Sequence, residues 1–152
     1  MTMEESSIND EILEMAVARE VDANRFYLAL AAGAKSPAMK RIFKKLAVEE
    51  LEHKAKLELE IMKTGKVVST KKKPAGLTGK FPDYSQFNFI VDYSGVLLMG
   101  IQKEQASIKL YTELAEMMTD THSREILLAI AEEEAGHKRR FQEAFNQAYE
   151  SG

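Results

Sequence analysis

Cysteine is absent from the 152-residue chain. Its absence excludes disulfide bonds, zinc ribbons, thiol catalysis, iron–sulfur clusters and an iron centre of the rubredoxin type. Proline is rare, with three residues, so few positions carry the residue that breaks helices. Any metal that the chain binds must therefore be held by oxygen and nitrogen atoms.

No apolar run approaches the roughly 20 residues that a membrane-spanning helix needs. The first ten residues are polar and acidic and lack the basic-then-apolar order of a secretory signal. Neither charge dominates, because 21 basic residues face 24 acidic ones and both signs are scattered. We therefore expect a cytoplasmic protein that acts on a small substrate, with neither nucleic acid nor a membrane as partner.

Apolar residues recur at helical spacing in four segments, which predicts an all-α fold in a single domain. Ser36-Pro37, a hydroxyl followed by proline, is a helix start signal, and Met39, Ile42 and Phe43 open the apolar stripe behind it. Asp120 is well placed to cap the last helix. The predicted helices span residues 8–35, 37–65, 92–119 and 121–150.

Residues 66–91 are predicted to connect the second and third helices, and they contain several glycines and prolines. A helix of about 27 residues is roughly 40 Å long, whereas extended chain covers about 3.3 Å per residue. The segment can therefore cross over the length of a bundle. We expect a four-helix bundle of two helical hairpins, with the second and third helices parallel.

The second hairpin repeats the first at an offset of 84 residues, so that Glu20 matches Glu104 and Tyr27 matches Tyr111. Two Glu-x-x-His pairs also match, and residues three apart project from one face of a helix. In each hairpin the single glutamate and the pair lie at similar distances from the turn, so they meet at one level. Six side chains converge in this way: Glu20, Glu50, His53, Glu104, Glu134 and His137.

Four carboxylates in an apolar core would cost several kcal/mol each or take up protons. Two divalent cations cancel their charge, and oxygen ligands with imidazole suit iron or manganese, although zinc and cobalt also bind such sites. We predict that Glu50 and Glu134 bridge two ions about 3.5 to 4 Å apart, with Glu20 and Glu104 terminal. A tyrosine follows each terminal glutamate by seven residues and is expected to hydrogen-bond a ligating glutamate: Tyr27 and Tyr111.

A glutamate on each of two helices, with Glu-x-x-His on the other two, is the ligand pattern of ferritin-like carboxylate proteins. With this spacing, residues 8–149 resemble the ferritin-like domain of the rubrerythrin family. The resemblance implies two iron ions that reduce hydrogen peroxide or dioxygen, with the four glutamates and two tyrosines as catalytic residues. Because a cysteine-rich rubredoxin domain is missing, the electrons are expected to come from a separate donor protein.

The sequence departs from the rubrerythrin pattern at Ser107, where rubrerythrins carry a further glutamate three residues after the third-helix ligand. The six ligands are thus closer to those of bacterioferritin-like ferroxidases. Two other functions stay open. One is iron oxidation and handling, and the other is a binding or structural bundle in which the metal only stabilises the fold. We expect a homodimer or small homo-oligomer for the enzyme, whereas iron storage needs a closed shell.

Three further features are interpreted without a role at the site. His122 has no acidic residue three before it and is expected to be exposed. The run from Lys71 to Lys73 could dock an acidic electron carrier, but such loop charges are usually only solvated. Four aromatic residues of the connection are expected to cap the bundle or pack a dimer: Phe81, Tyr84, Phe87 and Phe89.

Overall fold

The computed structural model describes residues 2–63 and 93–151, and of residues 148–151 only the backbone. Within these ranges the chain forms four helices and no strand: α1 (Met3–Gly33), α2 (Pro37–Lys63), α3 (Tyr93–Met117) and α4 (Thr121–Ser151). The predicted all-α class is confirmed.

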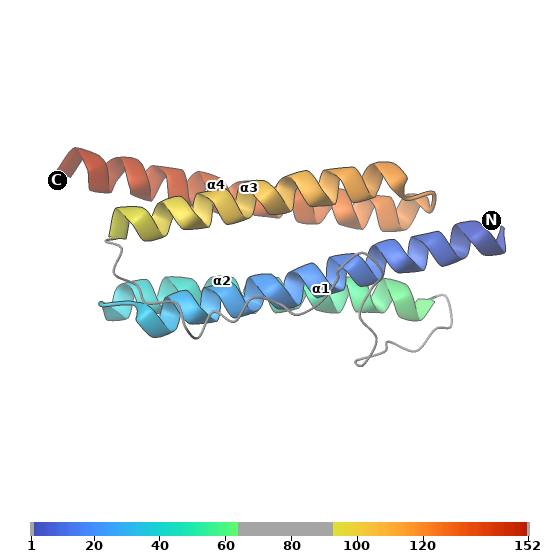
Figure 1. Ribbon diagram of the computed structural model, residues 1–152, viewed down its shortest axis with the longest axis horizontal. Coiled ribbons are helices and arrows are strands. Elements are labelled where there is room, and N and C mark those ends of the chain that lie inside the picture. The colour runs from blue at the N-terminus through green and yellow to red at the C-terminus, as the bar shows by residue number, and fades with distance from the viewer. Residues whose placement is uncertain (1, 64–92, 152) are drawn as a thin grey trace.

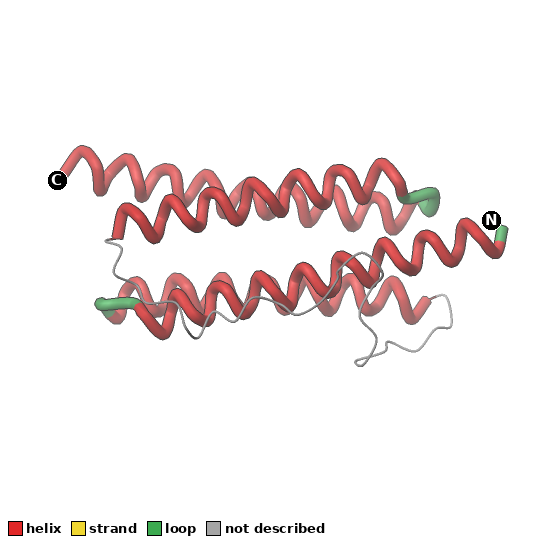
Figure 2. Tube along the Cα trace, viewed as in Figure 1, coloured by secondary structure: helices red, strands yellow, loops and turns green. Residues whose placement is uncertain are grey.

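The helices form a four-helix bundle of two hairpins, with α1 packed along α2 and α3 along α4 (Figure 1). Between the hairpins, α1 faces α3 and α2 faces α4. The second and third helices are parallel, and α2 ends at the opposite end of the bundle from the start of α3 (Figure 2). The predicted crossover and its features, the lysine run from Lys71 and the aromatic residues from Phe81 to Phe89, lie outside the described residues.

Short polar motifs start α1, α2 and α4. The Thr2 hydroxyl accepts a hydrogen bond from the Glu5 amide (3.1 Å), and the Glu5 carboxylate accepts one from the Thr2 amide (3.4 Å). This capping box starts α1 at Met3, five residues before the predicted start, because apolar spacing does not reveal a polar first turn. Ser36 and Asp120 cap α2 and α4 as predicted, by accepting hydrogen bonds from backbone amides at 3.2 and 2.9 Å.

Two apolar clusters fill the bundle and flank a buried polar layer. One cluster, around Leu57 and Leu127, has Tyr111 as its only aromatic ring among the described residues. The other holds Phe43 and Phe141, whose ring centroids are 6.5 Å apart. A Cβ on Gly100 would lie 3.0 Å from the Phe141 ring, so glycine lets this ring pack closely against α3.

One predicted position of the apolar stripe on α2 is wrong. Ile42 is 48% exposed, because Phe43, one position further along α2, takes the inward place and is 1% exposed.

Among the described residues, no helix is both long and apolar enough to cross a membrane.

Candidate metal centre

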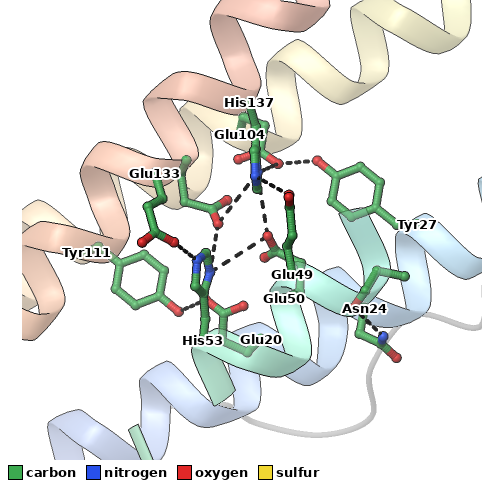
Figure 3. A network of polar contacts seen from close by, with 12 residues as sticks. Glu20, Asn24, Tyr27, Glu49, Glu50, His53, Glu104, Tyr111, Glu133 and His137 are labelled. Atoms are coloured by element: carbon green, nitrogen blue, oxygen red, sulfur yellow. Dashed lines mark hydrogen bonds and ion pairs between the residues drawn. The ribbon is translucent and has the colours of Figure 1, made fainter. Parts of the chain in front are cut away.

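The structure brings all six predicted ligands into one layer between the two apolar clusters. Figure 3 labels all of them except Glu134. Each helix contributes to the layer. The helices α1 and α3 provide one glutamate each, and α2 and α4 provide a Glu-x-x-His pair from one face. None of the side chains is more than 3% exposed: Glu20, Glu50, His53, Glu104, Glu134 and His137.

The six residues form two overlapping groups, and the ligand atoms of each group lie within 4.8 Å of one another. Glu50 and Glu134 belong to both groups. Glu20 and His53 complete the first group, while the second adds the matching pair from the other hairpin, Glu104 and His137. Two ions that share Glu50 and Glu134, as the bridging prediction requires, would fit this arrangement.

Both histidines present Nδ1 to the carboxylates. The Nδ1 atom of His53 lies 3.1 Å from a Glu134 oxygen and 3.6 Å from a Glu20 oxygen. In the other half, Nδ1 of His137 lies 3.5 Å from a Glu104 oxygen. The two rings are nearly parallel, with centroids 6.4 Å apart. Each ring therefore offers its Nδ1 atom to one of the two ligand groups.

Two glutamates that sequence reasoning missed contact the outer nitrogens of these rings. Glu133 of α4 contacts Nε2 of His53 on α2, and Glu49 of α2 lies 2.7 Å from Nε2 of His137 on α4 (Figure 3). A carboxylate on the outer nitrogen fixes the tautomer and the orientation of a metal-binding imidazole. The 84-residue repeat, which matches Glu49 with Glu133, was the available signal.

The two tyrosines also contact the site crosswise. Tyr27 of α1 donates a hydrogen bond to Glu104 of α3, and Tyr111 of α3 donates one to Glu20 of α1. Burial, followed by the charge of the contacted glutamate, raises the pKa of both phenols well above 10. Both hydroxyls therefore stay neutral donors at physiological pH.

Burial and mutual repulsion control the protonation of the carboxylates. Burial and the Glu20 charge raise the pKa of Glu50 far above its usual range, and burial with the Glu134 contact raises the pKa of Glu104 to about 11. Burial also raises the pKa of Glu134, but close contacts with Glu104 and His53 lower it to about 2. Burial lowers the pKa of His53, yet contacts with Glu134 and Glu20 raise it to about 11. Without metal the carboxylates therefore share protons.

Seven ligand atoms of this layer are buried and make no hydrogen bond to the described parts of the chain. They include both oxygens of Glu134 and the Nδ1 atoms of His53 and His137. A buried polar atom without a partner costs roughly 1–3 kcal/mol. Metal ions would engage these atoms at once and cancel the charge of the carboxylates, so the donor set fits two divalent cations.

Two further sequence predictions concern Ser107 and His122. Ser107, one turn after Glu104 on α3, is 2% exposed, so this position faces the interior. The His122 side chain is 59% exposed and lies 2.8 Å from Glu60 at the end of the bundle. It does not belong to either ligand group.

The fold and this site define a class, the ferritin-like di-iron carboxylate proteins. Within that class the rubrerythrin family model matches residues 11–86 and 95–151, and the chain belongs to the rubrerythrin family. Comparison with curated protein sequences gives no match.

Solved structures share the fold at low sequence identity. Bacterioferritin from Desulfovibrio desulfuricans is 18% identical, with a TM-score of 0.72 over 96% of this chain and 82% of that chain. The dodecameric thioferritin from Bacteroides fragilis is 21% identical, with a TM-score of 0.72 over 97% and 89%. A manganese catalase from Anabaena is 15% identical, with a TM-score of 0.73 over 92% and 73%. At these identities the likeness shows the fold alone.

Proposed function

We propose that the protein is a non-haem di-iron oxidoreductase that reduces hydrogen peroxide or dioxygen with electrons from a separate donor protein. The observation that carries this proposal is the pair of overlapping ligand groups that share Glu50 and Glu134. Membership of the rubrerythrin family supports iron as the metal. Manganese or zinc would satisfy the same donor atoms.

The residues of the chain have separate roles in this proposal. Glu20 with His53, and Glu104 with His137, would each hold one ion, and the two shared glutamates would hold both. A pair of bound ferrous ions would supply the two electrons that reduce one molecule of peroxide. Tyr27 and Tyr111 orient the terminal glutamates, Glu49 and Glu133 orient the histidines, and the apolar clusters keep bulk water from the layer.

Iron oxidation with transfer into a protein shell is the second candidate function. The likeness to a bacterioferritin and to a thioferritin described as dodecameric favours it. In that case the chain would assemble into a closed shell, whereas the oxidoreductase needs only a dimer or small homo-oligomer.

One experiment separates these functions. The protein is loaded anaerobically with two equivalents of ferrous iron, and the rates of oxidation by peroxide and by air are followed by absorbance. An oxidoreductase should turn over repeatedly when a reductant is supplied and keep its two ions. Continued uptake of added iron into a large assembly would favour the second function, and absence of saturable ferrous binding would overturn both.

A further inference from the structure

A small cavity of about 230 Å³ opens between α2 and α4, near the start of α3. Its wall includes Phe43, Leu46 and Phe141 of the second apolar cluster, and His137 also contributes to the wall. Two apolar side chains at this cavity stay accessible, since Ile42 is 48% and Tyr93 is 37% exposed. We call this cavity the α2–α4 pocket.

The internal repeat allows the pocket to be compared with the matching end of the bundle, where the same helix packing does not produce a similar pocket. The matching end of the bundle has a cavity of about 360 Å³, but its lining residues other than Leu13 are polar or charged, and it does not reach His53. Three positions are apolar or aromatic at the α2–α4 pocket and polar at the matching end: Met39 matches Ser123, Tyr93 matches Asn9, and Ala144 matches Glu60. The two ends therefore differ in the chemistry of their cavities.

The charged residues beside this apolar lining, Lys45 and Arg140, are both basic. Lys45 and Arg140 are exposed and line the pocket, and no acidic residue of the described chain lines it. Lys45 has no charged counterpart in the repeat, where its position is Ala129. An apolar body with a negative group complements these features.

The size of the pocket limits the ligand further. A cavity of about 150 Å³ holds a benzene ring, so 230 Å³ has room for somewhat more than one ring. We propose that the α2–α4 pocket binds a small aromatic carboxylate, with its rings against Phe43 and Phe141 and its carboxylate beside Lys45 and Arg140. This site goes beyond the proposed function and does not depend on it.

The test uses three probes with one apolar body and different charge: 2-naphthoate, neutral 2-naphthamide and cationic 2-naphthylmethylammonium. Binding to the full chain is measured by titration calorimetry, with and without bound zinc. We expect naphthoate to bind about fivefold more tightly than the amide, and the ammonium to bind least, because exposed cations contribute modestly. The difference should shrink with added salt. Equal binding of all three probes would overturn the charge assignment.

Variants locate the binding site. The double variant Lys45→Gln/Arg140→Gln should reduce naphthoate binding to that of the amide, while Lys56→Gln, which matches Arg140 in the repeat, should leave it unchanged. Ala144→Trp and Met39→Trp should fill the pocket and weaken binding by at least about tenfold. Gln142→Trp on the exposed side of α4 is the matched control.

Two results would contradict the proposal directly. One is the absence of saturable naphthoate binding to the unmodified protein. The other is unchanged binding in a tryptophan variant that circular dichroism shows to be folded. Because none of these measurements uses the redox reaction, their failure is distinct from failure of the proposed function.

Discussion

At the scale of single residues, the two halves of the centre differ in the carboxylates that contact the outer nitrogens of the histidines. Glu49 lies 2.7 Å from Nε2 of His137 and is partly buried, whereas the Glu133 side chain is 49% exposed and also lies 3.6 Å from Lys56. The two halves of the centre therefore have similar ligands, but the carboxylates on the outer nitrogens of the histidines differ in exposure to solvent. Substituting these carboxylates offers a way to lower the metal affinity without removing a ligand.

Glu49→Gln and Glu133→Gln should each lower the affinity for divalent metal by roughly 10- to 100-fold, because the imidazole loses its anionic partner. Cobalt titration followed by visible absorbance measures the change. Glu132→Gln, at an exposed neighbouring position, is the control and should retain the affinity. Equal affinities in all three variants would show that the outer contacts do not orient the histidines.

The raised pKa values predict a pH dependence of the metal-free protein. On folding, the pKa of Glu104 rises from 4.5 to about 11, so the fold favours its protonated form. This contribution to stability is complete below pH 4.5 and is lost as the pH rises towards 11. His53, raised from 6.5 to about 11, changes stability in the same direction above pH 6.5.

We therefore expect the melting temperature of protein kept in chelator to fall from about pH 6 to about pH 9. Calorimetry over this range provides the measurement, and Glu104→Gln should show a smaller fall. Metal loading should release protons from the centre into a weak buffer. A melting temperature that rises over this range would contradict the assigned protonation.

The buried serine on α3 predicts a change in oxidant preference. Ser107→Glu should place a carboxylate near the ligand layer, where a serine hydroxyl is a poor competitor for a divalent ion. If the proposed function holds, the variant should favour peroxide over dioxygen relative to the parent. Oxidation of ferrous-loaded protein by each oxidant gives the rate ratio. An unchanged ratio would mean that position 107 does not act on the metals.

At the scale of helices, polar caps fix where α1, α2 and α4 start. Asp120 accepts a hydrogen bond from the Ser123 amide at 2.9 Å, and this contact lowers the pKa of the Asp120 carboxyl. The start of α4 in turn sets the level at which Glu134 and His137 reach the centre. A cap at one end of the hairpin thus contributes to the register of the ligands.

Asp120→Ala should destabilise the metal-free protein by about 1 kcal/mol at neutral pH. Because the pKa of Asp120 is lowered on folding, its contribution is present above pH 3.8 and is lost as the pH falls below it. Urea unfolding at two pH values measures this, with the exposed Glu125→Ala as control. The same loss at acidic and neutral pH would argue against a charged cap.

At the scale of the whole molecule, the ligand layer joins the two hairpins. Tyr27 and Tyr111 link α1 to α3, while the His53–Glu133 and His137–Glu49 contacts link α2 to α4. Most other packing lies within each hairpin, between α1 and α2 and between α3 and α4. Ions in this layer would therefore hold the hairpins together.

Zinc, which does not change oxidation state, should stabilise the fold by about 2.7 kcal/mol at a hundredfold excess over its dissociation constant. For a domain of this size the melting temperature should rise by about 5 to 10 °C. Scanning calorimetry with zinc and with chelator measures the shift, and Glu50→Ala/Glu134→Ala should abolish it. If zinc leaves the melting temperature unchanged, these residues do not form a metal site.

The sequence by itself determined the four helices, their pairing as a repeated hairpin and the convergence of the six candidate ligands. These features follow from helical periodicity and from equal distances to the turns at Ser36 and Asp120, which are local properties of the chain. The tertiary structure decided which helix each tyrosine contacts, and it revealed Glu49 and Glu133 as partners of the histidines. It also decided that the α2–α4 pocket reaches His137, whereas the cavity at the matching end does not reach His53. These contacts join residues that are far apart in the chain, so their geometry depends on how the two hairpins dock.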